Sequence, residues 1–199
     1  GGDGDAFSIG GNHFNHCARK NVNLTYVVMD NNVYGLTKKQ TSPTSPIGFK
    51  SKTDMWGAVD KPINPMQQAI SAGATFVARS THTNPKHLLS MMEAAMDHKG
   101  FAFIECLSEC TEFYDGAFDS SNPRKGGEFK EVPEDHDPTD ENAAYALAEE
   151  LVPGHFGIYY QIDRPSKQDI EAKINAKFLE KTKGMEDWEI LQQNFDKMK

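Results

Sequence analysis

The residues best suited to chemistry stand at the start of the chain, where a carboxylate lies between two glycines in Gly2-Asp3-Gly4. Asn31 follows Asp3 by 28 residues (31 − 3), soon after the apolar run 24–29. Mg²⁺ accepts carboxylate and amide oxygens and usually keeps phosphate oxygens as further ligands. Glycines beside the carboxylate let the backbone approach phosphates closely. The pattern predicts a site for a cation and a diphosphate, and its plain alternative is an Asp-Gly turn that caps a helix.

Composition limits the classes of protein to be considered. The chain has 199 residues and a formal net charge of −8, and this length suits one α/β domain with a sizeable core. The acidic balance argues against a nucleic-acid partner. No apolar run approaches the ~20 residues that span a bilayer, so we expect no membrane partner. Cys17, Cys106 and Cys110 form no disulfide pattern, so we expect reduced thiols and a cytoplasmic location.

The elements that must position these residues alternate along the chain. Strands are expected at 24–29, 75–79 and 101–107, helices at 6–20, 64–72, 84–98 and 139–151, an apolar segment at 156–162 and a charged helical tail from Ser166. Strands alternating with helices predict βαβ units, hence a mostly parallel sheet with helices on both faces. Residues 37–63 are expected to form a long loop. The inward-facing helix positions are expected to be Phe7, Ile9, Phe14, Cys17, Leu88, Leu89, Met92, Ala95 and Met96.

A longer series of residues makes the opening motif more specific. It comprises Gly2-Asp3-Gly4-Asp5, Ile9-Gly10-Gly11-Asn12-His13 and Asn31-Asn32-Val33-Tyr34-Gly35-Leu36-Thr37-Lys38, and it continues into Gln40-Thr41-Ser42-Pro43-Thr44-Ser45. The GDG-to-Asn spacing resembles the thiamine diphosphate signature. The whole series resembles the β subunit of the 2-oxoacid:ferredoxin oxidoreductases, particularly the 2-oxoglutarate:ferredoxin (2-oxoglutarate synthase) branch. The resemblance is close over residues 1–120 and loose beyond them.

The resemblance implies an α/β, thiamine diphosphate-binding fold with a mostly parallel sheet and a helical C-terminal tail. It implies that 1–120 form the domain that binds thiamine diphosphate and Mg²⁺, and that 121–199 form a loop and a helical extension. A GDG turn normally follows a buried strand. We therefore expect the chain to be the C-terminal portion of a longer subunit, truncated at the N-terminus.

Roles for single residues follow from the resemblance. Asp3, Asn31 and the backbone carbonyl of Val33 are implied as Mg²⁺ ligands. The implied thiamine diphosphate contacts are Gly2, Gly4, Asp5, Gly35 and Leu36. Lys38 stands where the family carries a lysine implicated in recognition of coenzyme A or of the substrate carboxylate, and its anionic ligands make a lysine sensible there. The plain alternative for Lys38 is a solvated loop lysine.

The cysteines have different implied roles. Cys110 is implied as one of four thiolate ligands of a 4Fe-4S cluster, a set that this chain's three cysteines cannot supply alone. In the family the other three ligands precede the GDG motif. Cys17 and Cys106 are expected to be core residues. The chain departs from the family pattern at Lys39, where glycine is usual, at Glu109, where proline is common, and in lacking the region upstream of the GDG motif.

The implied activity is the coenzyme A-dependent oxidative decarboxylation of 2-oxoglutarate to succinyl-CoA, or its reverse, with electrons passing to ferredoxin. An α subunit would complete the site in an αβ or (αβ)2 assembly. Two alternatives stay open. One is the same chemistry on pyruvate or a broad range of 2-oxoacids, and the other is a non-catalytic fragment that binds a cofactor or a partner.

Overall fold

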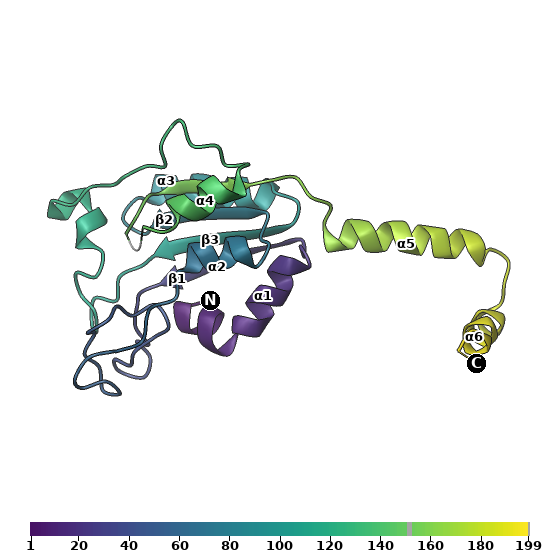
Figure 1. The fold of residues 1–199 in the computed structure, drawn as a ribbon, viewed down its shortest axis with the longest axis horizontal. Helices are drawn as coiled ribbons and strands as arrows, with labels where there is room; N and C mark the ends of the chain where they lie inside the picture. Colours follow the sequence, from purple (N-terminus) through teal and green to yellow (C-terminus); the bar gives the residue numbers. More distant parts are fainter. Residues whose placement is uncertain (151–152, 199) are drawn as a thin grey trace.

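The computed structural model describes residues 1–150 and 153–198. Its body is a four-stranded sheet with the strand order β1-β3-β2-β4 (Figure 1). The strands are β1 (Leu24–Asp30), β2 (Phe76–Thr81), β3 (Phe101–Leu107) and β4 (Gly157–Gln161). β1 and β2 both pair with β3 in parallel, and β4 pairs with β2 in antiparallel orientation. The expected α/β fold with a mostly parallel sheet is confirmed.

The helical elements of the described residues are η1 (Asp5–Ile9), α1 (Gly11–Arg19), α2 (Pro65–Ser71), α3 (Pro85–Asp97), η2 (Asp119–Ser121), η3 (Pro123–Lys125), α4 (Glu141–Leu147), α5 (Lys167–Lys181) and α6 (Asp187–Asp196). Two starts follow from Asn-Pro signals in the sequence. Asn64 accepts the backbone N–H of Gln67 at 3.1 Å, and Asn84 accepts that of His87 at 3.3 Å. In each case proline fills the first helical position, where no N–H is needed.

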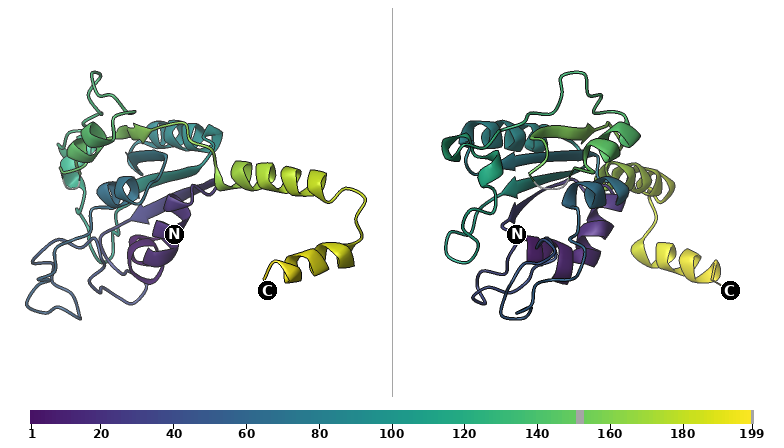
Figure 2. Two further views of the ribbon diagram at one scale, coloured as in Figure 1. Left: turned by 45° about the vertical axis from the view of Figure 1, so that its right-hand side comes forward. Right: turned by 60° about the vertical axis from the view of Figure 1, so that its left-hand side comes forward.

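Helices cover both faces of the sheet (Figures 1 and 2). On one face, η1, α1, α2 and α4 share one core cluster with residues of β1, β2, β3 and β4. Phe14 of α1 makes edge-to-face contacts there with Phe101 and Phe103 of β3, at centroid distances of 5.6 and 5.3 Å. On the other face, α3 packs Ala95, with Leu88 and Met92 beside it, against β2 and β3.

Several expectations about burial are wrong. β1 lies at the edge of the described sheet and exposes Leu24 and Met29, although its continuous apolar run is typical of a strand covered on both faces. Ile9 is 85% exposed, because η1 is a π-helical turn whose wider spacing changes which side chains face the core. Leu89 and Met96 of α3 are also exposed, since they lie beside the helical stripe formed by Leu88, Met92 and Ala95.

The α4 helix is shorter than expected. It ends at Leu147, whereas the expected helix extended to residue 151, which lies outside the described residues. The apolar segment 156–162 contains the edge strand β4. Residues beyond 120 thus contribute one strand to the sheet, and the division of the chain at residue 120 stays a prediction.

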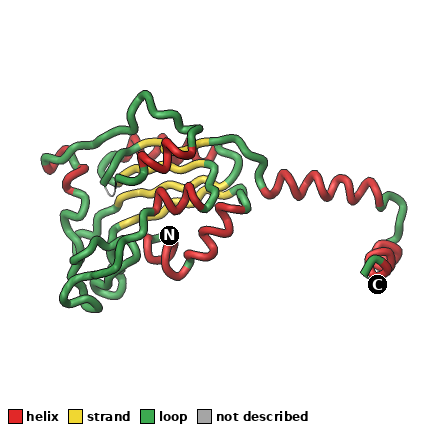
Figure 3. Tube along the Cα trace, viewed as in Figure 1, coloured by secondary structure: helices red, strands yellow, loops and turns green. Residues whose placement is uncertain are grey.

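Long loops gather at the end of the sheet where β1 and β3 finish (Figure 3). The expected loop at 37–63 is confirmed, because these residues contain no helix or strand. At the other side of the body, α5 and α6 form an arm that extends away from the sheet (Figures 1 and 2). The arm exposes apolar side chains such as Phe178, Trp188 and Phe195. Within the described residues, no helix combines the length and apolar character needed to cross a bilayer.

Candidate cofactor site

The Gly2-Asp3-Gly4 turn is held against the end of β1. Gly2 bridges Met29 in parallel orientation, and the Met29 N–H donates to the Gly1 carbonyl at 2.9 Å. This pairing brings Asp3 to the same end of the sheet as the residues that follow β1. Ligands of open α/β sheets bind at the carboxyl ends of the strands, and both halves of the predicted site lie there.

Asp3 is buried, with 3% of its surface exposed, and one hydroxyl joins it to a second carboxyl group. Thr44 Oγ1 lies 2.9 Å from Asp3 Oδ2 and 2.8 Å from Asp30 Oδ1. Burial raises the pKa of Asp3, although hydrogen bonds from Ser42 and Thr44 oppose this. Burial, with the charges of Glu105 and Asp3, raises the pKa of Asp30 well above its usual value. A hydroxyl carries one proton, so Thr44 can donate to only one of these two carboxyl groups at a time.

The turn after β1 fixes the second half of the site. The Val33 N–H donates to Asn31 Oδ1 at 3.1 Å, and the Tyr34 and Gln40 backbones exchange hydrogen bonds of 2.9 and 3.2 Å. Asn31 and Val33 are therefore held within one tight turn. Asn32 lies in the same turn, and its buried Oδ1 has no hydrogen-bond partner in the described structure. A buried oxygen without a donor is costly, so an added cation or donor group at this place would stabilise it.

Asp5, Leu36 and Lys38 differ in their surroundings. The Asp5 carboxylate accepts the Gly2 N–H at 3.0 Å and thus closes the opening turn. Leu36 is fully exposed. Lys38 is also exposed, and its backbone has a φ of 62° with its N–H donating to the Gly35 carbonyl at 2.9 Å. Cofactor contacts by Asp5 and Leu36 and the role of Lys38 stay predictions.

The site suits a cation that is bound together with a ligand whose phosphates supply part of its oxygen coordination. Within the parts of the chain that the structure describes, no group of three or more His, Cys, Asp or Glu side chains is placed to hold a metal. A cation here would therefore depend on Asp3, on amide and carbonyl oxygens, and on phosphates of the ligand. This all-oxygen set suits Mg²⁺, which is commonly held by one or two carboxylates together with phosphates.

The structure leaves no space for a side chain at Gly4, because a Cβ there would lie 1.9 Å from a ring carbon of Tyr34. Gly4→Ala should displace this ring and the turn that carries it, at the cost of about 1–3 kcal/mol typical of overpacking. We expect affinity for thiamine diphosphate with Mg²⁺ to fall on the order of tenfold or more by calorimetry. Gly11→Ala is the matched control, since a Cβ at Gly11 meets no atom within 4 Å. Equal affinity of the two variants would contradict the assignment.

The three cysteines are free and occupy different environments. Cys106 is fully buried in β3, and burial, together with Glu105, raises the pKa of its thiol to about 11. Cys17 packs at the margin of the core, so both expectations of a core role are confirmed. Cys110 is half-buried, and its Sγ lies 3.5 Å from the position that a Cβ on Gly35 would take. The candidate cluster ligand thus touches the predicted cofactor loop, while its role as a ligand stays a prediction.

The sequence analysis did not predict a buried ion pair between the neighbouring strands β2 and β3. Arg79 Nε lies 2.5 Å from Glu105 Oε2, and both side chains are essentially inaccessible. The same arginine donates to the Pro153 carbonyl at 3.1 Å. A cavity of about 200 Å³ is lined by Arg79, Asn32 and Thr44, among others. A glutamate inside the apolar run 101–107 was the available signal, because a buried charge needs a partner.

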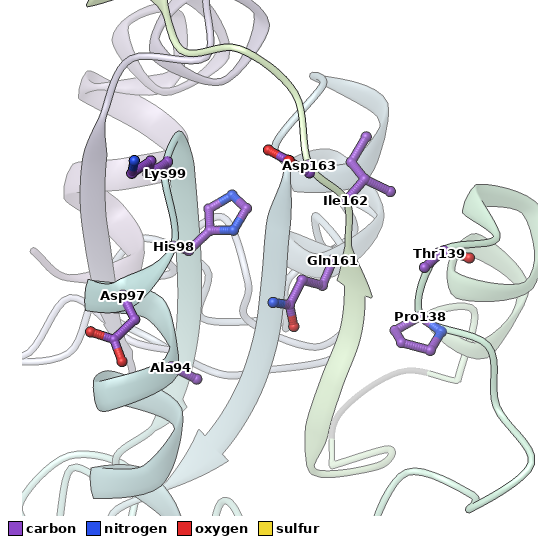
Figure 4. Close-up of a pocket in the computed structure, with 9 residues that line it drawn as sticks. All are labelled: Ala94, Asp97, His98, Lys99, Pro138, Thr139, Gln161, Ile162 and Asp163. Atoms are coloured by element: carbon purple, nitrogen blue, oxygen red, sulfur yellow. The ribbon is translucent and has the colours of Figure 1, made fainter. Parts of the chain in front are cut away.

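A second hollow lies at the opposite end of the sheet and does not belong to this site. It has a volume of about 660 Å³, with Asp97, His98 and Lys99 on one side and Gln161 and Asp163 on the other (Figure 4). These residues lie near the start of β3 and the end of the antiparallel β4. The hollow is therefore at the amino ends of the parallel strands, away from Asp3.

Together, a buried carboxylate on a glycine turn and an amide turn after a parallel strand define a diphosphate-binding α/β protein. Comparison with known proteins identifies the family within this class. The model of the thiamine pyrophosphate enzyme C-terminal TPP binding domain matches residues 1–106, more than half of the chain. The chain therefore belongs to the thiamine pyrophosphate enzyme family. The expected thiamine diphosphate-binding fold is confirmed.

Individual relatives narrow the comparison. The 2-oxoglutarate oxidoreductase subunit KorB of Mycobacterium tuberculosis is 46% identical over 119 residues, which cover 60% of this chain and 32% of that subunit. The 2-oxoglutarate synthase subunit KorB of Methanocaldococcus jannaschii is 45% identical over 120 residues, which cover 60% of this chain and 44% of that subunit. The matched segment thus spans less than half of either relative.

One solved structure resembles almost the whole chain. It is a 2-oxoglutarate:ferredoxin oxidoreductase from Magnetococcus marinus with 2-oxoglutarate, coenzyme A and succinyl-CoA bound. The match has a TM-score of 0.86 and 38% identity, and it covers 97% of this chain and 65% of that chain. The resemblance to the β subunits of 2-oxoacid:ferredoxin oxidoreductases is thereby confirmed.

Proposed function

We propose that this chain is the part of a 2-oxoglutarate:ferredoxin oxidoreductase β subunit that binds thiamine diphosphate and Mg²⁺. The reaction is the coenzyme A-dependent oxidative decarboxylation of 2-oxoglutarate to succinyl-CoA, or its reverse. The observation that carries the proposal is buried Asp3, presented on a glycine turn beside the Asn31 turn. The relatives named as 2-oxoglutarate enzymes support the choice of substrate.

The chain's own residues hold and orient the cofactor in this proposal. Asp3, Asn31 and the Val33 carbonyl bind Mg²⁺, while Gly2, Gly4, Asp5, Gly35 and Leu36 contact thiamine diphosphate. When bound, thiamine diphosphate supplies the electron sink for decarboxylation. Thr44 fixes the Asp3 carboxylate through its hydroxyl, which keeps the metal ligand in one orientation. Lys38 attracts an anionic reactant.

The proposal includes an α subunit, ferredoxin as the electron acceptor, and an αβ or (αβ)2 assembly. Cys110 is proposed to ligate a 4Fe-4S cluster with three thiolates supplied from outside this chain. Its contact with the Gly35 region supports this, because a cluster there would lie close to the cofactor loop. The three free thiols also support a reducing, cytoplasmic location.

The test uses the purified complex that contains this chain. We expect 2-oxoglutarate with coenzyme A to reduce viologen and to yield succinyl-CoA by mass spectrometry. Pyruvate should give a kcat/KM lower by at least about tenfold. It lacks the second carboxylate of 2-oxoglutarate, so the groups of the pocket that pair with that carboxylate would stay unpaired. Reactions without coenzyme A are the control.

Each adverse outcome has its own meaning. Equal use of pyruvate would show that the substrate assignment is wrong. If the complex holds thiamine diphosphate and its cluster but turns over neither acid, the chain is a non-catalytic binding component and the proposal fails.

A further inference from the structure

The C-terminal arm consists of α5 and α6, which are joined by residues 182–186. It extends away from the sheet in each view (Figures 1 and 2). Both helices lie entirely within the described residues, and neither contains a buried side chain. By contrast, α1, α2, α3 and α4 each bury at least one side chain. The arm helices therefore contribute nothing to the core of their own chain.

Each helix of the arm carries one apolar stripe. The stripes share a spacing of three or four residues and are formed by Ile170, Ile174 and Phe178 in α5, and by Trp188, Leu191, Phe195 and Met198 in and just after α6. All seven side chains are at least 45% exposed. Residues at this spacing share one face of a helix, and such a face normally packs against another element.

Helix length gives a second reason to expect a partner for the arm. α5 has 15 residues and α6 has 10. Isolated helices shorter than about 12–15 residues are marginal in water, and most helical stability in proteins comes from packing of the apolar face. A capping box formed by Glu186 and Glu189 supports the start of α6 but leaves its stripe uncovered. The arm therefore requires a surface that its own core does not supply.

The two helices carry opposite formal charges. α5 contains four lysines and three acidic residues, a net charge of +1, whereas α6 contains three acidic residues and no basic one, a net charge of −3. Lys173 and Lys177 each precede a stripe residue, and neither forms an ion pair within the described part of the chain. α5 and α6 are thus complementary in charge, and both present an apolar stripe.

This self-complementarity selects a second copy of the chain as the partner. A two-fold interface uses the same surface on both copies, so α5 of each copy can meet α6 of the other. Two helices joined by a short linker can also pack as a hairpin within one chain. In the structure, however, neither arm helix buries a side chain against the other.

We propose that the arm exchanges with the arm of a second copy, so that α5 and α6 of two copies form a four-helix bundle. The apolar stripes form the core of this bundle, and the lysines of each α5 lie beside the carboxylates of the other copy's α6. The bundle joins two αβ units. The inference goes beyond the proposed function, because it depends on neither the substrate nor the cofactor.

Exchanged charges test the pairing in the complete complex. Lys173→Glu/Lys177→Glu changes α5 from +1 to −3, and Asp187→Lys/Asp196→Lys changes α6 from −3 to +1. Each double variant should raise the dissociation constant for two copies on the order of tenfold or more, measured by sedimentation at low salt. An equimolar mixture of the two double variants should restore association, and so should one chain that carries all four changes.

The mixture separates exchange between copies from pairing within one chain. No single chain in it carries opposite charges on α5 and α6, so only contacts between different copies can restore association. If the fourfold variant associates and the mixture does not, the helices pair within one chain and the proposal is wrong. Unchanged association of both double variants would also overturn it.

A further variant tests the apolar stripe. Trp188→Ala removes the largest side chain of the α6 stripe and should weaken association on the order of tenfold or more, as expected for a buried aromatic at an interface. Gln193→Ala is the matched control, because Gln193 is exposed on the opposite side of α6. Unfolding of the body should be unchanged in both variants, since α6 buries no side chain there. Equal association of the two variants would contradict the bundle.

Photocrosslinking identifies the partner directly. Phe178 is replaced by benzoylphenylalanine in a complex assembled from unlabelled and isotope-labelled copies of the chain. Crosslinked peptides should join α5 of one copy to residues 186–198 of a copy with the other label. Crosslinks confined to one copy, or to the α subunit, reject the proposal. Because the readout is a crosslink, it holds whether or not the complex consumes 2-oxoglutarate, and failure of the proposed function stays distinguishable.

Discussion

Asp3→Ala should lower the affinity for thiamine diphosphate with Mg²⁺ about 100-fold or more. This is the largest effect that we expect for a substitution at the site. The loss of a residue that only supports a metal ligand typically costs about 10–100-fold, and a direct ligand should cost at least as much. Asp3 is the carboxylate that Thr44 and the opening turn place at the end of β1. Titration calorimetry with and without Mg²⁺ measures the effect, and the variant should lose the dependence on Mg²⁺.

Stability of the ligand-free protein separates this effect from misfolding. Burial raises the pKa of Asp3, which means that the charged carboxylate is unfavourable in the folded chain without a cation. Asp3→Asn should therefore unfold no earlier than the wild type when no ligand is present, yet should still bind weakly. Asp97→Ala, at the exposed end of α3, is the control and should bind normally. Retained Mg²⁺-dependent binding in Asp3→Asn and Asp3→Ala would falsify the metal-site assignment.

Arg79→Met destabilises the fold by about 3–5 kcal/mol, the range for breaking a buried pair at one partner. Both partners are essentially inaccessible to solvent, and Arg79 Nε lies 2.5 Å from Glu105 Oε2. Removal of Arg79 leaves the Glu105 charge in the middle of the sheet, beside Asp30, with no cation to compensate it. Urea denaturation followed by circular dichroism measures the free energy of unfolding.

A double variant tests the cause of this loss. Arg79→Met/Glu105→Leu removes both charges, so it should recover much of the stability lost in Arg79→Met. Lys125→Met is the matched control, because Lys125 is exposed and its surface pairing with Asp119 should contribute little to stability. A double variant as unstable as Arg79→Met alone would show that packing, not the unpaired charge, causes the effect.

Local patterns accounted for much of what the sequence predicted correctly. The Asn-Pro starts of α2 and α3 depend on residues three positions apart, and the β3 strand follows from a run that is apolar at every position except Glu105. The Asp3-to-Asn31 spacing also predicted that these two residues form one site, and the structure holds the opening turn against the end of β1. These signals lie in the chain itself and need no knowledge of its tertiary contacts.

Features that depend on distant contacts were not predicted. Thr44 reaches Asp3 across 41 residues, and Arg79 pairs with Glu105 across 26. The position of β1 at the sheet edge depends on strand order, which periodicity does not encode. The net charge also hides the group of lysines around one hollow of the long loop, because a sum over the chain averages a local excess of lysines against acids elsewhere.

The strand order has a consequence for synthesis of the protein. Among the strands that the structure describes, β1 and β2 are not neighbours, and each pairs in parallel with β3. β3 is completed 77 residues after β1 (107 − 30), which takes roughly 4–15 s at translation rates of about 5–20 residues per second. During that interval neither of the two earlier strands has β3 available for pairing. Slow codons between β2 and β3 should therefore increase aggregation of the nascent chain, whereas slow codons after β3 should have less effect.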